Sequence, residues 1–228
     1  MIARRVLDLL IAALGIVVLA PLAALICLAI LIEDGRPIFF SQTRLGLKGK
    51  YFRIYKFRKF YKSIGATAPL TLKDDARMTR LGHVLARTKL DELPQFWNVL
   101  KGDMSIVGPR PESIDFADCF TGTYERVLDY KPGIFGPSQV FLRDESSLFP
   151  ANSDPLQFYR DVLFHQKALN DLAYYPHRTI VSDIRWIIRG ILVTLGFRWA
   201  LPKANGIDQS TRAEEFGWSL PYSGGIPK

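Results

Sequence analysis

The stretch that decides the fold is VLDLLIAALGIVVLAPLAALICLAILI, residues 6–32, which carries a single charged side chain, Asp8, over 27 residues. A straight helix of that length would run to roughly 40 Å, against about 30 Å for the hydrocarbon core of a bilayer. The run is longer than the apolar part of a secretory signal peptide, and Glu33-Asp34-Gly35-Arg36 follows it instead of a small-residue cleavage site. It is also apolar all round, which favours a bilayer over a half-buried position on a soluble domain. We therefore predict that residues 1–34 insert into a membrane.

Pro21 interrupts this apolar run near its middle. Proline lacks the N–H that would bond to the carbonyl of Val17, and its ring clashes with that carbonyl, so we expect a kink. Two topologies are open, a kinked helix that spans the membrane and a re-entrant helix that breaks at Pro21 and returns to the same face. Because Arg4 and Arg5 precede the run and Arg36 follows it, basic residues on both sides favour re-entry with both ends in the cytoplasm.

The composition of the rest of the chain indicates a folded domain. Of the 228 residues, 48% are hydrophobic and 23% are charged, which excludes a disordered chain. Two cysteines, Cys27 inside the apolar run and Cys119, do not form a disulfide framework. No Cys/His cluster has the spacing of metal ligands. We expect a domain over residues 35–200 and a mobile tail, rich in Gly, Pro and Ser, over residues 201–228.

A basic stretch without any acidic residue follows the apolar run, and its excess of charge exceeds the net charge of +8 of the whole chain. Lipid head groups or other phosphates would attract it, at about 1 kcal/mol for each Lys or Arg. Solvated charges that only set the topology, and a nucleic-acid surface, are the alternatives. We favour phosphate or lipid contact and expect no nucleic acid. The ten residues are Arg36, Arg44, Lys48, Lys50, Arg53, Lys56, Arg58, Lys59, Lys62 and Lys73.

The remaining patterns predict an α+β fold that is predominantly helical. Aromatic and β-branched residues over Pro37–Thr43 and Tyr51–Phe57, with glycines between them, predict a small β-hairpin. A helix is expected from Leu93 to Leu100, with Pro94 in its first turn and Gly102 just after its end. Another helix is expected over Asp154–Tyr174.

The last strong element is Arg178–Trp199, which has isoleucines at helical spacing and Arg185 and Arg189 off that stripe. An amphipathic helix on a membrane surface and an ordinary helix packed on the core both explain this pattern. We include it among the surface amphipathic helices of a monotopic membrane protein.

Asp91 and Glu92 directly precede the helix that contains Pro94. Carboxylates in a first turn face the partly positive end of a helix, so capping alone would explain them. Neighbouring helical residues point about 100° apart, so this pair cannot share one proton as a facing dyad does. The two carboxylates could instead act separately, Asp91 as a nucleophile and Glu92 as its partner base or orienter. A carboxylate that attacks phosphorus forms an acyl phosphate.

Arg110 lies between Pro109 and Pro111. The fixed φ angles of both prolines limit the backbone, so the guanidinium is presented at low entropic cost, and arginine binds phosphate oxygens with two parallel hydrogen bonds. A rigid turn with a solvated arginine is the alternative. No Walker loop and no Gly-x-Gly-x-x-Gly fingerprint is present.

These residues belong to blocks that closely resemble the bacterial sugar transferases, the small monotopic polyprenyl-phosphate phosphoglycosyl transferases. The resemblance extends over roughly residues 1–198, and its central block is long and ungapped. The blocks that carry it are Gln42–Gly46, Tyr55–Arg58, Asp75–Gly82, Leu90–Pro111, Lys131–Ile134 and Asp171–Tyr175.

The resemblance implies transfer of a sugar 1-phosphate from a UDP-sugar to polyprenyl (undecaprenyl) phosphate, with release of UMP, as the first membrane step of glycan assembly. It also implies Mg²⁺ that bridges the donor phosphates, a re-entrant helix broken at Pro21, and the cytoplasmic face of a bacterial inner membrane. Asp91 is then the nucleophile that carries the sugar phosphate and a candidate Mg²⁺ ligand, and Glu92 is its partner. Arg110, Arg87 and Lys101 are the expected substrate contacts. A homo-oligomer is compatible with the resemblance.

Three departures from the family pattern stand out. Ala20 replaces the serine before Pro21. In Ala86–Lys89, one basic residue stands at a different position from that in the family pattern. The turn Gly133–Val140 lacks the usual Thr and Trp, which points to a different sugar. Two rival functions use the same residues. A non-catalytic anchor would bind anionic lipid through Gly35–Lys73, and a metal-dependent phosphodiesterase would transfer the phosphoryl group to water.

Overall fold

The structure is a computed structural model that describes residues 2–63, 69–72, 74–150 and 153–197. Lys73, Trp199 and the predicted tail over residues 201–228 lie outside this part of the chain. The helices are α1 (Ile2–Asp34), α2 (Arg80–Thr88), α3 (Gln95–Lys101), α4 (Pro137–Phe141), α5 (Pro155–Phe158), α6 (Phe164–Tyr174) and α7 (Ile180–Thr194), and the strands are β1 (Phe39–Leu45), β2 (Tyr51–Phe57), β3 (Ser105–Val107) and β4 (Gly133–Phe135). The predicted α+β, mostly helical class is confirmed.

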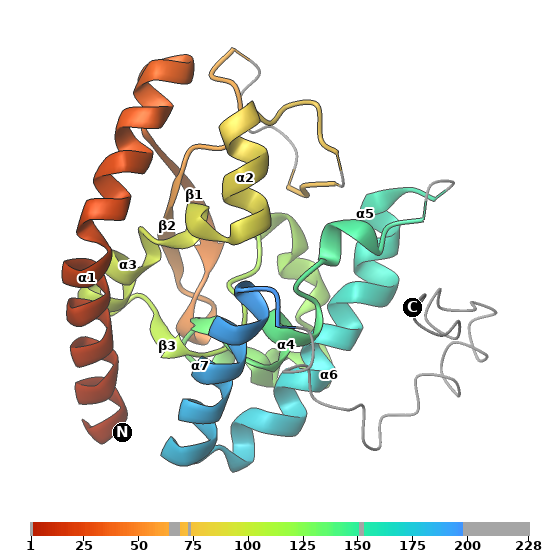
Figure 1. The fold of residues 1–228 in the computed structure, drawn as a ribbon. Helices are drawn as coiled ribbons and strands as arrows, with labels where there is room; N and C mark the ends of the chain where they lie inside the picture. The colour runs from red at the N-terminus through yellow and green to blue at the C-terminus, as the bar shows by residue number, and fades with distance from the viewer. Residues whose placement is uncertain (1, 64–68, 73, 151–152, 198–228) are drawn as a thin grey trace.

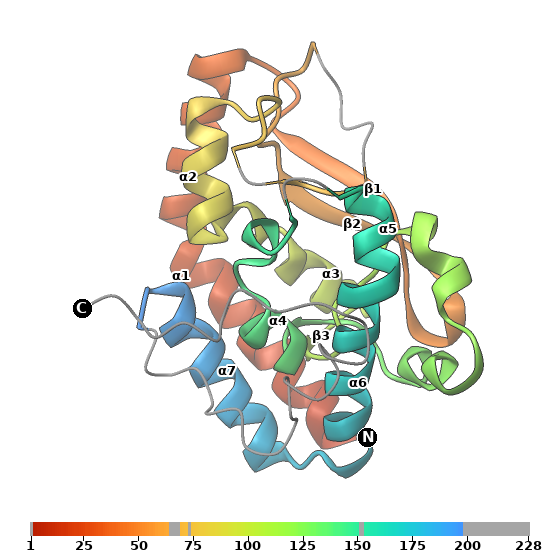
Figure 2. The same cartoon turned by 90° about the vertical axis from the view of Figure 1, so that its right-hand side faces the viewer.

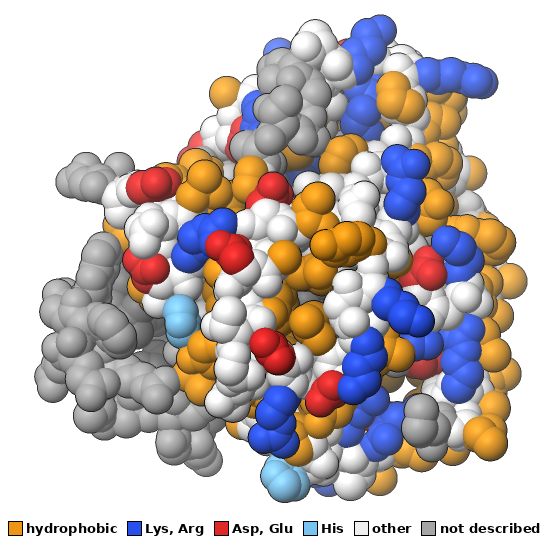
Figure 3. Space-filling model, turned by 180° about the vertical axis from the view of Figure 1, so that it is seen from behind, with side chains coloured by type: hydrophobic (Ala, Val, Ile, Leu, Met, Phe, Trp, Pro, Cys, Tyr) orange, Lys and Arg blue, Asp and Glu red, His pale blue; other side chains and the backbone are white. Residues whose placement is uncertain are grey.

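Helix α1 runs along one side of the molecule and bends about midway (Figure 1). Pro21 lies inside this helix of 33 residues without ending it, so the expected break is a bend in one continuous helix. Its outer side is apolar and exposed, as at Leu10, Val17 and Leu28, and hydrophobic side chains gather along that edge of the molecule (Figure 3). Among the described residues, α1 is the one helix long and apolar enough to cross a membrane.

Both ends of α1 are fixed to the rest of the protein. Near the N-terminus, the buried carboxylate of Asp8 accepts hydrogen bonds from the hydroxyl of Ser105 at 2.8 Å and from the backbone N–H of Ile106 at 2.8 Å. At the other end, the buried guanidinium of Arg58 donates to the carboxylate of Asp34. The two ends of the apolar helix are therefore held by the same domain.

The predicted hairpin is confirmed as β1 paired with β2, antiparallel from Phe39 opposite Phe57 to Leu45 opposite Tyr51. The side chain of Ile54 turns inward and joins a core cluster with Val99 of α3, Ile106 of β3 and Ala12 of α1. The hairpin, α3 and the membrane helix thus share one apolar core, which fixes their relative positions.

A second sheet, the parallel pair β3 and β4, was not predicted from the sequence. Gly108 and Gly133 cross closely there, since a Cβ on Gly133 would lie 2.0 Å from the backbone N of Gly108. Only glycine allows this approach. The contact holds the Pro109–Pro111 segment next to the turn that leads into α4.

The predicted helix over Asp154–Tyr174 is confirmed, although it consists of α5, a π-helical segment (η6, Tyr159–Leu163) and α6. Helix α7 is capped at its start by Thr179 and Ser182. It packs on the core through Ile187, while Ile188 and Ile191 on its outer side are about half exposed. The expected apolar stripe is therefore divided between the core and the surface.

Helix α7 lies next to the membrane helix. Figures 1 and 2 show α2 beside the C-terminal part of α1 and α7 beside its N-terminal part. An ion pair of 3.0 Å between Arg4 of α1 and Asp183 of α7 joins the two helices. Both of these neighbouring helices expose apolar side chains to the outside.

Candidate active site

The predicted carboxylate pair lies in a short 3₁₀ turn, η2 (Leu90–Glu92), between α2 and α3. Lys89 adopts a left-handed conformation with φ 59° at the start of this turn, which redirects the chain after α2. The carboxylate of Asp91 is 3% exposed, and its Oδ1 atom is buried without a hydrogen-bond partner in the described part of the chain. Its Oδ2 atom lies 3.9 Å from the ammonium of Lys59. A buried carboxylate oxygen without a partner is energetically costly and is typical of functional sites.

Glu92, in contrast, is bound by two cations at one oxygen. Its Oε1 atom lies 2.8 Å from Nζ of Lys56 on β2 and 3.2 Å from Nη2 of Arg110. Burial alone would raise the pKa of Glu92, but the charges of Lys56, Arg110 and Lys89 hold it well below the usual value. The charge of Glu92 in turn raises the pKa of Arg110 against the effect of burial. Glu92 is therefore ionised and serves as the centre of a cation cluster.

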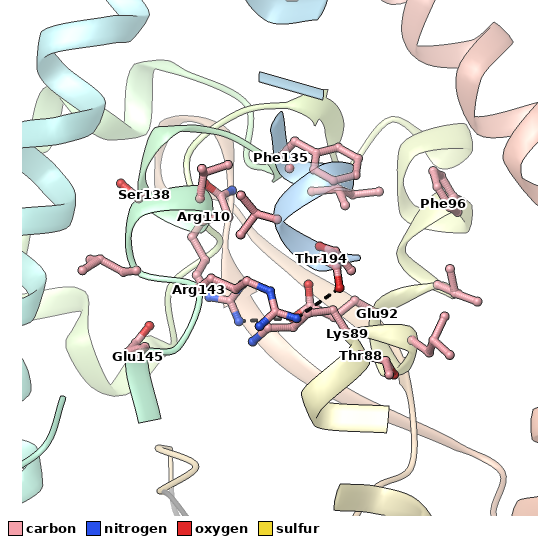
Figure 4. Close-up of a pocket in the computed structure, with 18 residues that line it drawn as sticks. Thr88, Lys89, Glu92, Phe96, Arg110, Phe135, Ser138, Arg143, Glu145 and Thr194 are labelled. Carbon is pink, nitrogen blue, oxygen red and sulfur yellow. Dashed lines mark hydrogen bonds and ion pairs between the residues drawn. The ribbon is translucent and has the colours of Figure 1, made fainter. Parts of the chain in front are cut away.

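Two cavities meet at this cluster. The larger, of about 640 Å³, lies between the hairpin, α2 and the segment around Glu145, and Asp91 and Lys59 line it. The smaller, of about 160 Å³, lies between η2, α4 and α7, and both apolar and polar side chains line it (Figure 4). Five residues line both cavities. They are Lys89, Glu92, Arg110, Arg143 and Glu145.

The structure brings most of the sequence-predicted site residues together. Asp91, Glu92 and Arg110 meet as described, and Arg87 lines the larger cavity from the last turn of α2. Lys101 is placed elsewhere. It lies at the far end of α3, pairs with Asp103 at 2.9 Å, and lines neither of these two cavities.

Part of the basic stretch after α1 faces this site instead of a lipid surface. Lys56 binds Glu92, Lys59 lies beside Asp91, and the partly buried Arg44 lines the larger cavity. Arg58 is buried against Asp34. These basic side chains therefore line a cavity between elements, and Lys56 does so because the pleat of β2 turns alternate side chains inward.

Sequence reasoning missed the residues that support the site from distant parts of the chain. Arg143 donates to the carbonyls of Arg87, at 2.8 Å, and Thr194, at 3.3 Å, and so ties the end of α2 to the end of α7 (Figure 4). The buried ammonium of Lys167 on α6 lies 3.0 Å from Glu145. Both cations lie outside recognisable motifs, so no local signal could have found them.

The carboxylate oxygens of this site suit Mg²⁺ only if the substrate supplies further ligands to the ion. Among the described residues, no group of three His, Cys, Asp or Glu side chains forms a metal site. Asp91 offers one free carboxylate oxygen, whereas Glu92 is occupied by Lys56 and Arg110. Mg²⁺ is commonly held by one or two carboxylates together with the phosphates of a substrate. Asp91 fits that arrangement.

Comparison with known proteins identifies the family of this chain. A family model described as bacterial sugar transferase matches residues 1–196. The chain belongs to the bacterial sugar transferase family. The resemblance inferred from the sequence blocks is thereby confirmed, and the carboxylate pair, Arg110 and the membrane helix all lie within the matched region.

Curated relatives of this sugar transferase carry different sugars in their names. The galactosyl transferase CpsE of Streptococcus agalactiae serotype III (strain NEM316) is 38% identical over 207 residues, which are 86% of this chain and 42% of the relative. The UDP-N-acetylgalactosamine-undecaprenyl-phosphate N-acetylgalactosaminephosphotransferase of Aeromonas hydrophila is 40% identical over 143 residues, 60% of this chain and 33% of the relative. The UDP-glucose:undecaprenyl-phosphate glucose-1-phosphate transferase of Caulobacter vibrioides is 41% identical over 141 residues, 60% of this chain and 53% of the relative. The chain thus spans between 33% and 53% of the length of these relatives.

Proposed function

We propose that this sugar transferase moves a sugar 1-phosphate from a UDP-sugar to polyprenyl phosphate, giving polyprenyl-diphosphate-sugar and UMP, as the first membrane step of glycan assembly. The observation that carries the proposal is the free, buried Oδ1 atom of Asp91 on the wall of a cavity rich in cations, next to an apolar membrane helix. The names of the relatives, which include undecaprenyl-phosphate sugar phosphotransferases, support the same reaction.

The reaction proceeds in two displacements at one phosphorus atom. Oδ1 of Asp91 attacks the phosphorus that carries the sugar, the bond from this phosphorus to the bridging oxygen of the donor breaks, and UMP leaves with the electron pair. A phosphate oxygen of polyprenyl phosphate then attacks the same phosphorus, and the bond to Asp91 breaks to regenerate the carboxylate. Neither step requires a proton from the protein.

Glu92 acts as an orienter in this scheme. Its depressed pKa keeps it ionised, and a carboxylate already held by Lys56 and Arg110 is a weak base. By fixing the two cations, Glu92 directs their remaining N–H groups toward the phosphates that enter the cavity. Of the two roles that the sequence left open for Glu92, the geometry supports this one.

Mg²⁺ is the proposed cofactor. Asp91 and the diphosphate of the donor would hold it, and it supplies positive charge that neutralises the diphosphate. Lys59, 3.9 Å from Asp91, adds a positive charge of the protein on the same side. Lys56 and Arg110 provide the charge on the side of Glu92.

We further propose that α1 enters and leaves the membrane on the cytoplasmic face of a bacterial inner membrane. The support is that the same domain binds Asp8 near one end and Asp34 at the other. A helix that spans the bilayer would carry one of these ends to the far side. In cells without Cys27 and Cys119, cysteines introduced at Ala3 and Lys50 should both escape a membrane-impermeant thiol reagent until the membrane is permeabilised. Labelling of the Ala3 position in intact cells would contradict re-entry.

The activity is tested with the full chain in a membrane or detergent, supplied with Mg²⁺, polyprenyl phosphate and a panel of UDP-sugars, by measurement of UMP. We expect one or a few donors to release UMP, at a rate that depends on polyprenyl phosphate. No UMP from any donor would contradict the proposal and favour a non-catalytic anchor. Sustained release of UMP over many turnovers that does not depend on polyprenyl phosphate would favour the phosphodiesterase.

A further inference from the structure

The two cavities that meet at the cation cluster differ in chemistry. Asp91, Lys59 and Arg87 line only the larger one, which suits a polar, charged ligand. The smaller cavity has cations only where the two meet, at Lys89, Arg110 and Arg143. Its other walls are mainly apolar, with Phe96, Phe135 and Val193 among them. It therefore matches a ligand with one anionic end and an apolar body.

The smaller cavity also lies next to the apolar surface of the molecule. One wall comes from Gly190 and Val193 on the inner side of α7, the helix whose outer side exposes Ile188 and Ile191. Phe96 lines another part of the cavity and packs against α1, where a Cβ on Gly15 would lie 3.1 Å from its ring. The cavity therefore lies between α7 and a side chain that contacts α1, two helices that both expose apolar residues on their outer sides.

We infer that the smaller cavity receives the phosphate end and the first isoprene units of polyprenyl phosphate, and that Phe135 is a residue that selects this acceptor. The inference rests on the proposed function and adds the place where the acceptor binds. The phosphate would lie at Lys89 and Arg143, beside Glu92, so that its attacking oxygen approaches from the side of the site opposite the donor cavity.

Phe135 is fixed in position by a specific contact. A Cβ on Gly190 of α7 would lie 2.3 Å from Cδ1 of the Phe135 ring, so the ring occupies the space that the glycine leaves. Phe135 belongs to the turn Gly133–Val140, whose departure from the family pattern we took as a sign of a different sugar. Because Phe135 lines the smaller cavity and not the larger, this departure concerns the lipid acceptor instead.

The test separates the two half-reactions of the full chain with Phe135→Ala and the milder Phe135→Leu. UMP released in a single turnover without acceptor reports the donor half, and the dependence of sustained turnover on polyprenyl phosphate reports the acceptor half. We expect Phe135→Ala to raise KM for polyprenyl phosphate by about tenfold or more, as for other losses of apolar contact in a binding pocket, with Phe135→Leu between it and the wild type. The single-turnover release and KM for the UDP-sugar should stay within about twofold.

Phe141→Ala is the matched control. Phe141 lies on α4, packs on Trp186 with ring centroids 5.7 Å apart, and lines neither of the two described cavities. This variant should leave both half-reactions unchanged. The inference is overturned if Phe135→Ala changes KM for the donor but not for the acceptor, or if both Phe135 variants lose UMP release without acceptor. A wild-type chain that releases no UMP from any donor would instead overturn the proposed function itself.

Discussion

The surroundings of Asp91 and of Glu92 differ sharply, although the two residues are neighbours in the same 3₁₀ turn. The Asp91 side opens only into the larger cavity, has one carboxylate oxygen without a partner, and keeps its nearest cation, Lys59, at 3.9 Å. The Glu92 side lies where both cavities meet, and two cations bind its carboxylate at 2.8 Å and 3.2 Å. Adjacent side chains in a 3₁₀ turn point about 120° apart, which allows one turn to serve both environments.

This difference shows how burial acts on a carboxylate. A buried carboxylate with good partners is stabilised in its ionised form and holds its neighbours in place. A buried carboxylate with a free oxygen has lost water without full compensation, so an electrophile or a metal ion at that position is favoured. On this basis Asp91 reacts and Glu92 positions, and the predictions below test that division.

The largest effect is expected for Asp91→Asn. An amide is nearly isosteric but a poor nucleophile, so turnover should fall by at least about a thousandfold while the fold is kept. With a donor labelled in the phosphate next to the sugar and no acceptor, the wild type should retain label on the protein and Asp91→Asn should not. Turnover of the variant within tenfold of the wild type would contradict the assignment.

The substitution Arg110→Lys tests the role of a cation that binds Glu92. Lysine keeps the charge but loses the planar fork that contacts Glu92 and that, in the proposed reaction, also binds a phosphate. We expect kcat/KM to fall by an amount equivalent to about 1–3 kcal/mol. Arg53→Lys is the control, because Arg53 contacts Ser41 on the hairpin and lines neither described cavity. Equal kinetics for both variants would show that Arg110 is only a turn residue.

The sequence predicted those parts of the site that depend on local signals. Asp91 and Glu92 were found because a helix start follows them, and Arg110 because two prolines flank it. Lys101 was expected among the substrate contacts from the family resemblance, but the short helix α3 carries it away from the turn. Lys56 and Arg143 reach the site through the pairing of the hairpin and the packing of α4, which no local pattern encodes.

Asp8 tests whether the rule for buried carboxylates holds outside the active site. It is buried like Asp91, but both of its carboxylate oxygens accept hydrogen bonds, from Ser105 and Ile106. Asp8→Asn should therefore lower stability by about 1–3 kcal/mol, because an amide cannot accept all of these bonds. Activity per folded molecule should be kept. Thermal unfolding in detergent measures the first effect, and turnover at a temperature well below unfolding measures the second. An unchanged melting temperature would contradict the rule.

The smallest effect concerns Lys59, the cation nearest to Asp91. Burial lowers the pKa of Lys59 to about 8, even though the charge of Asp91 acts to raise it. Lys59 is therefore charged below pH 8 and loses its charge as the pH rises through that value. A neutral Lys59 no longer offsets the repulsion between the Asp91 carboxylate and the donor diphosphate, so the donor half-reaction should slow at higher pH.

The expected change is a few-fold, because at 3.9 Å the charge acts without a direct hydrogen bond to Asp91. Single-turnover UMP release, measured from pH 6.5 to 9.5 without acceptor, should decline with a midpoint near 8 in the wild type. In Lys59→Arg the guanidinium stays charged over this whole range, so the decline should disappear, whereas Lys50→Arg, outside both described cavities, should retain it. If Lys59→Arg keeps the wild-type profile, the decline belongs to another group and Asp91 reacts without help from this cation. If the profile is flat in the wild type, Lys59 is not the charge that allows an anionic donor to approach Asp91.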